Sequence, residues 1–147
     1  MSFRDANRCL EKVLDDGWLS TPKKWQNVPF DPPKDSNGNA EPYVAFAVFE
    51  NEGINITLGS DNPWYRWTGL AIISVFVPEN TGPDLARQYA DTIKALFLMK
   101  SLSLTPGAVG TTGIVRTRVP RITQANDTDH GFYQVNVSVP YNREAHT

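Results

Sequence analysis

The sequence has little of the side-chain chemistry from which catalytic and metal sites are built. Its 147 residues include one cysteine, Cys9, and two histidines, His130 and His146. A single cysteine cannot form an internal disulfide, and these three side chains lack the paired spacing of a zinc site. We therefore expect a protein that binds no metal and needs no cofactor.

Catalytic motifs are equally scarce. A Ser/His/Asp or Cys/His site would have to use His130, which falls in the turn sequence NDTDHGF, where polar turn residues are a sufficient explanation. Gly107, Gly110 and Gly113 resemble a phosphate-binding loop only loosely, because no Gly-Lys-Ser/Thr follows and the next expected element is a strand. The sequence predicts a protein that is not an enzyme.

Long apolar runs are also missing. No stretch reaches the roughly 18 apolar residues that a membrane-spanning helix requires. The N-terminal sequence MSFRDANRCLEK carries charges where a signal peptide has an apolar segment. We expect a protein that is made and used without membrane insertion.

Acidic residues are absent from one part of the chain. The whole sequence has 14 basic and 16 acidic residues, and its net charge of -2 argues against a strongly basic nucleic-acid-binding protein. Between Asp91 and Asp127, however, no acidic residue occurs. The basic residues of this window are Lys94, Lys100, Arg116, Arg118 and Arg121. Charge is therefore distributed unevenly along the chain.

Hydrophobic periodicity predicts two helices and several strands. Apolar residues at three- and four-residue steps predict helices over 3–14 and 85–97, the second with Thr81 or Asp84 as its cap. Apolar alternation predicts strands over 42–50, 69–77, 114–122 and 131–141. The order of these elements indicates a single α+β domain over 1–147, with a mostly antiparallel sheet of about four to five strands packed with two helices.

Residues 18–41 form a proline-rich arm and loop between the first helix and the first strand. Its prolines exclude a helix interior and favour extended backbone. The arm also carries large apolar side chains that a solvated linker has no reason to carry. These are Trp18, Trp25, Val28 and Phe30. We expect them to pack against another part of the protein.

The strand over 69–77 is apolar at both even and odd positions, which predicts that both of its faces are covered. One cover can be a helix of the same subunit, and the other a second layer or a neighbouring chain. Trp64, Tyr65, Arg66 and Trp67 precede this strand. They could be a stacking platform for bases or sugars, the anchor of a protein interface, or the end of a core strand, and we favour the two structural interpretations.

Four stretches carry a resemblance to a known family: WQNVPFDPP, WYRWTGLAIISVFVPENTG, LARQYADTIKALF and GFYQVNVSVPY. In this order they resemble the tail terminator proteins of long-tailed, non-contractile bacteriophages, over nearly the whole chain. The resemblance implies a structural virion protein that forms a ring of six subunits. The ring caps the finished tail tube, stops its polymerisation and offers a surface for head joining.

The same resemblance implies where the protein acts and with what. Its partners would be further copies of itself, the tail tube protein and the head–tail connector proteins, while genome DNA passes through the lumen without specific binding. The protein would be synthesised in the host cytoplasm and would occupy the head-proximal end of the tail in the virion. We expect no membrane among its partners.

Two groups of residues are candidates for contact sites in such a ring. Aromatic residues and Arg are frequent interface anchors, which predicts a subunit or tube interface formed by Trp18, Trp25, Phe30, Trp64, Tyr65, Arg66 and Trp67. Alternation over 114–122 places Val115, Thr117 and Val119 on one side, and Arg116 and Arg118 on the other. Together with Arg121, these arginines could pair with a neighbour's carboxylates, line the lumen, or remain solvated.

Two other functions remain open. The closer alternative is another head–tail connector or completion (stopper) protein of the phage neck, which shares the ring but binds the portal side. From a different class, a small sugar- or nucleic-acid-binding module could use Trp64, Tyr65 and Trp67 as a stacking surface. Such a module would bind its ligand as a monomer, whereas a terminator would form rings or bind tube ends.

Overall fold

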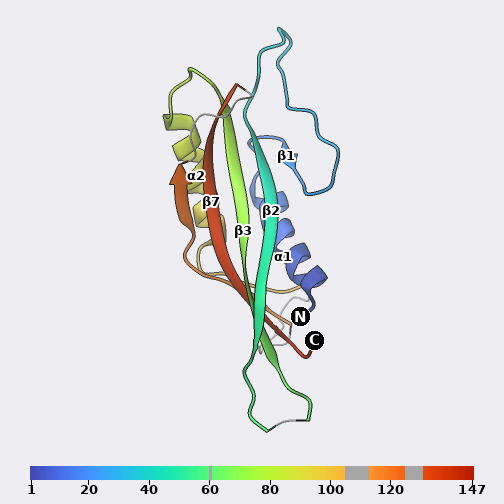
Figure 1. The fold of residues 1–147 in the computed structure, drawn as a ribbon. Helices are drawn as coiled ribbons and strands as arrows, with labels where there is room; N and C mark the ends of the chain where they lie inside the picture. Colours follow the sequence, from blue (N-terminus) through green and yellow to red (C-terminus); the bar gives the residue numbers. More distant parts are fainter. Residues whose placement is uncertain (60, 105–112, 125–130) are drawn as a thin grey trace.

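Three long antiparallel strands form the centre of the fold (Figure 1). The computed structural model describes residues 1–59, 61–104, 113–124 and 131–147, so the expectations for Gly107, Gly110 and His130 fall outside it. The elements are α1 (Phe3–Gly17), β1 (Lys23–Lys24), β2 (Tyr43–Asn55), β3 (Tyr65–Pro78), α2 (Asp84–Phe97), β4 (Ser101–Leu102), β5 (Val115–Thr117), β6 (Arg121–Gln124) and β7 (Phe132–Ala145).

The α+β class and the two helices are confirmed, but the sheet has seven strands instead of four to five. Its order is β1-β2-β3-β7-β5-β4, and β6 also pairs with β7. The strand predicted over 114–122 is in fact two strands, β5 and β6. The break falls at Arg118–Pro120, because Pro120 has no N–H to donate.

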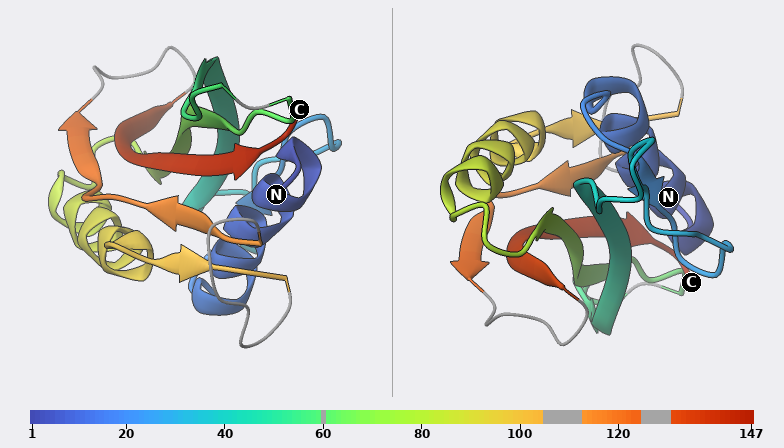
Figure 2. Two further views of the ribbon diagram at one scale, coloured as in Figure 1. Left: turned by 90° about the horizontal axis from the view of Figure 1, so that it is seen from below. Right: turned by 90° about the horizontal axis from the view of Figure 1, so that it is seen from above.

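Both helices cover the same face of the sheet, as the two end-on views show (Figure 2). Alternate side chains of the central strands are buried against α1 and α2. They are Val44, Phe46 and Val48 of β2, Ala71, Ile73, Val75 and Val77 of β3, and Val135, Val137 and Val139 of β7. The strict period-two alternation that predicted these strands is therefore the pattern of a sheet with one covered face.

The opposite face of β2, β3 and β7, here called the open face, is covered by no helix. At one end the arm reaches over it, and Phe30 packs on Tyr43 with ring centroids 5.1 Å apart. Further along, Phe49 is 56% exposed and Leu70 is 36% exposed. Within the described residues, only one face of β3 is fully covered, so the second predicted cover is not supplied by this part of the subunit.

The two helices differ in how their N-terminal ends are capped. Helix α1 begins after Ser2, whose hydroxyl accepts a hydrogen bond of 3.1 Å from the Asp5 N–H. The prediction of a side-chain cap for α2 was wrong. Asp84 is already its first helical residue, and Thr81 instead donates to the Pro78 carbonyl at 2.7 Å. In the described part of the chain, no helix is long and apolar enough to cross a membrane.

Candidate functional site

The aromatic side chains of the arm pack within their own subunit. Trp18 is 2% exposed, and its indole N–H donates to the Thr21 hydroxyl at 2.9 Å, so no neighbour can reach it in this structure. Trp25 lies 5.6 Å from the ring of Phe46, at the edge of the core. Phe30 packs on Tyr43, so the side chains of Trp25 and Phe30 both attach the arm to β2.

The cluster over 64–67 is divided between the two faces of the sheet. Trp64 packs on His146, with ring centroids 3.6 Å apart. Arg66 lies on the open face and forms an ion pair of 2.7 Å with Glu144, whose side chain is 8% exposed. Trp67 lies on the helix-covered face, opposite Gly53 of β2. These residues therefore do not form one flat stacking platform.

A buried ion pair joins β2 to β7 beside the bulge in β2. The Arg143 guanidinium donates to both carboxylate oxygens of Glu50, at 2.7 Å and 2.8 Å, and to the Met1 carbonyl at 3.1 Å. The two side chains are only 5% and 14% exposed. The guanidinium carbon also lies 5.2 Å from the Trp67 ring. This network connects β2, β3, β7 and the start of α1 beside the bulge in β2.

Sequence reasoning missed this network, although a signal was present. Arg143 continues the alternation of Val135, Val137 and Val139, so its parity placed it on the buried face. A charge on such a face requires a partner. Tyr141 has the same parity, and burial, followed by the negative charge of Glu50, raises the pKa of its hydroxyl.

Beyond the bulge, the ends of β2 and β3 extend past the body of the protein (Figure 1). We call residues 51–59 and 61–64 the hairpin end. It exposes Ile54, Ile56 and Leu58, with exposed fractions of 57%, 36% and 100%. Glu52 and Asp61 are exposed on the same segment. The hairpin end therefore combines three exposed apolar side chains with two exposed acids.

A second exposed apolar cluster lies between the residues that follow α2 and the residues that follow β5. We call Leu98, Met99, Lys100, Arg118 and Val119 the α2–β4 patch. Leu98 is 44% exposed, Met99 65% and Val119 58%. We predicted that Val119 lies on the same side of the strand as Val115 and Thr117. That prediction is wrong, because Val115 and Thr117 are buried. The reason is that β5 ends at Thr117. The Met99 N–H donates to the Arg118 carbonyl at 3.4 Å, which joins the two halves of the patch.

Buried Thr117 holds this patch in position. Its hydroxyl donates to the carbonyl of Phe97, the last residue of α2, at 2.6 Å. The same oxygen accepts from the Lys100 N–H at 2.8 Å. Thr117 is 3% exposed, so water cannot replace these bonds without opening the structure.

The three predicted arginines lie along β5, β6 and their connection and do not share one environment. Arg116 is opposite Asn142 and Arg121 is opposite Ser138, which places both at the border of the open face. Arg118 is exposed on the connection between β5 and β6. None of the three forms an ion pair with the residues that the structure describes.

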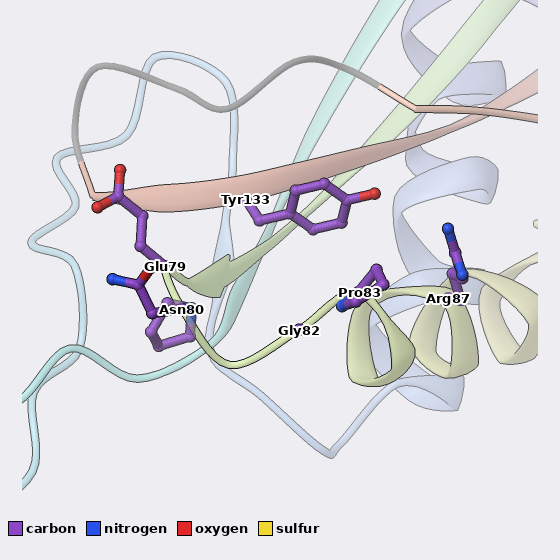
Figure 3. Close-up of a pocket in the computed structure, with 7 residues that line it drawn as sticks. Glu79, Asn80, Gly82, Pro83, Arg87 and Tyr133 are labelled. Carbon is purple, nitrogen blue, oxygen red and sulfur yellow. The ribbon is translucent and has the colours of Figure 1, made fainter.

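A hollow of about 530 Å³ lies between the β3–α2 turn and β7. Figure 3 shows the Tyr133 ring pointing towards Arg87, while Glu79 lies on the turn. The described residues that line this hollow include no pairing of a nucleophile with a base. Among the described residues, no group of three His, Cys, Asp or Glu side chains could hold a metal ion.

Comparison with known proteins assigns the family. The family model described as "Phage tail terminator protein" matches residues 6–141. The chain belongs to the phage tail terminator family. One solved structure aligns with a TM-score of 0.68 and 26% identity, and the alignment covers 97% of this chain and 95% of the other. A comparison with curated proteins found no match.

Membership of this family makes the tail terminator a structural component of the virion tail. The candidate surfaces for contact with other proteins are the open face, the hairpin end and the α2–β4 patch, because each exposes apolar side chains that the described part of the subunit leaves uncovered.

We predict that Glu50→Ala destabilises the terminator by about 3 to 5 kcal/mol, because it leaves the Arg143 charge buried without its carboxylate. Urea unfolding of the purified protein measures the loss. Asp16→Ala is the matched control, since the Lys12–Asp16 pair is exposed and screened by solvent, so its loss changes the stability little. Equal losses in the two variants would contradict the role of the buried pair.

A second prediction concerns the Thr117 hydroxyl. Thr117→Val keeps the shape of the side chain but leaves the Phe97 carbonyl and the Lys100 N–H without this partner, at a cost of about 1 to 3 kcal/mol. Thr123→Val is the control, because the Thr123 hydroxyl has no hydrogen bond within the described residues. Thermal unfolding that fails to separate the two variants would show that Thr117 does not hold the patch.

Proposed function

We propose that this terminator forms a ring that caps the phage tail tube, ends its polymerisation and provides the surface to which the head joins. The observation that carries the proposal is the family match over residues 6–141. The ring itself is supported by the surface of the subunit, since a ring needs two different surfaces that meet on neighbouring copies.

The open face supports assembly by its composition. Apart from Thr68 and Ser74, its β2 and β3 side chains between the aromatic end and the hairpin end are apolar. These are Ala45, Ala47, Phe49, Leu70 and Ile72. The neighbouring strand β7 contributes Asn136, Ser138 and Pro140, and the Glu144 carboxylate on this face is paired with Arg66. A partly apolar sheet face with its carboxylate paired is typical of a surface that another protein covers.

The resemblance gives the remaining details of the proposal. Six copies would surround a lumen through which the genome passes without specific binding. One end of the ring would meet the tail tube protein, and the other would meet the connector proteins of the head. The protein would therefore occupy the head-proximal end of the tail, after synthesis in the host cytoplasm.

Electron microscopy of the purified protein, alone and mixed with tail tubes, tests this proposal. We expect rings, a density cap at one tube end, and arrest of tube growth when the protein is added to polymerising tube protein. An unrelated protein of similar mass is the control. Uncapped tubes that continue to grow at saturating terminator would contradict the proposed function, and binding to portal assemblies alone would favour a neck connector.

A further inference from the structure

We propose that the hairpin end of one copy docks on the α2–β4 patch of the next copy around the ring. This inference rests on the proposed function and specifies which surfaces join. The hairpin end presents Ile54, Ile56 and Leu58, while the patch presents Leu98, Met99 and Val119. Contact between the two removes both apolar clusters from water, which is the main favourable term in protein association.

Charge determines which surfaces can meet. The hairpin end carries the exposed acids Glu52 and Asp61, and the patch carries the exposed cations Lys100 and Arg118. No acidic residue occurs in the sequence from 92 to 126. Two hairpin ends would bring acids together, and two patches would bring cations together, and both arrangements are unfavourable. Complementary charge therefore favours the contact between unlike surfaces.

A contact between unlike surfaces has a consequence for symmetry. Each copy uses its hairpin end towards one neighbour and its patch towards the other. Such a head-to-tail contact forms a closed ring when the rotation between copies closes. An isologous contact would instead stop at a dimer. The two surfaces thus have the arrangement that ring assembly requires.

The sheet order keeps one copy from forming this contact with itself. The hairpin end is the continuation of β2 and β3, whereas the patch lies beside β5 and β4, beyond the opposite edge of β7. Figure 2 shows the β2–β3 connection and α2 on different sides of the sheet. A second copy is therefore needed to bring the two surfaces together.

The backbone of the patch includes one residue in an unfavourable conformation. Met99 has φ of 50°, in the left-handed region, which is unfavourable for a residue with a side chain. The bonds of Thr117 to Phe97 and Lys100 fix this conformation and direct Met99 into solvent. Backbone strain of this kind is found preferentially at functional sites.

Charge reversal with rescue tests the contact. The hairpin variant is Glu52→Lys with Asp61→Lys, the patch variant is Lys100→Glu with Arg118→Glu, and the third variant combines all four changes. Analytical ultracentrifugation measures ring formation in solution, and electron microscopy measures capping of tail tubes. We expect each double variant to assemble at least about tenfold more weakly, because it places like charges together.

The combined variant separates this contact from a general loss of charge. It restores opposite charges in every copy, so we expect its assembly to return to within about threefold of the original protein. Absence of rescue would overturn the proposal, and so would double variants that assemble normally. A hairpin variant that still forms rings but no longer caps tubes would place the hairpin end on the tube, which also overturns the proposal.

Cysteine cross-linking tests proximity directly. Leu58→Cys combined with Met99→Cys is oxidised in the presence of tail tubes, and we expect a ladder of disulfide-linked copies up to the closed ring. The native thiol interferes little, because Cys9 is 3% exposed and burial raises its pKa. Leu58→Cys combined with Leu19→Cys is the control, since Leu19 is 82% exposed outside the patch. Equal ladders in both variants, or none in either, would contradict the contact.

Met99→Gly separates a role in docking from a role in folding. Glycine adopts the left-handed conformation without strain, so we expect the variant to be at least as resistant to thermal unfolding as the original protein. Its assembly should nevertheless weaken, because the exposed side chain is lost. Normal assembly of this variant would show that Met99 is not an anchor. If the original protein neither forms rings nor caps tubes, the proposed function itself fails, which distinguishes that failure from the failure of the contact.

Discussion

The uninterrupted pairing of β3 with β7 is the constraint on which the rest of the structure depends. The two strands stay in register from Tyr65 opposite Ala145 to Pro78 opposite Phe132. A shift of one residue would turn Ile73 and Val137 away from the helices and expose the core. The same register brings Arg143 beside Trp67, and β2 completes the site by placing Glu50 against the guanidinium. Core and charge network therefore depend on one alignment.

This alignment also determines which surfaces remain for assembly. Because both helices lie on one face, the subunit is closed on that side and has an apolar face on the other. The strands β2 and β3 continue past the core, so their hairpin end projects from the body. On the other edge of β7, Thr117 joins α2 to β5 and fixes the α2–β4 patch. A single sheet thus provides surfaces of different character in different directions, which the proposed ring would need.

The sequence predicts the elements whose periodicity is strong and misses those without one. Helix α1 and the strands β3 and β7 follow from their apolar patterns, because each has one face in the core. The two-residue strands β1 and β4 are too short to show alternation, and the outer part of β2 is exposed on both faces, so no pattern marks it.

The candidate surfaces were harder to foresee for a related reason. Glu50 and Arg143 are 93 residues apart, and only the sheet register brings them together. The hairpin end and the patch combine a few exposed apolar residues with charges, which in a sequence look like ordinary loops. Trp18, by contrast, is conspicuous in the sequence but lies in the core. Large aromatic side chains serve cores and interfaces equally well, so residue type alone does not separate the two.

The length distribution of tails is the measurement that tests the account most directly. Tails would be imaged by electron microscopy in lysates from cells in which this protein is depleted and in lysates where it is supplied again from a plasmid. A terminator that stops tube growth predicts over-long, headless tubes without the protein, and tails of uniform length joined to heads after it is restored. Tails of normal length in its absence would contradict the account.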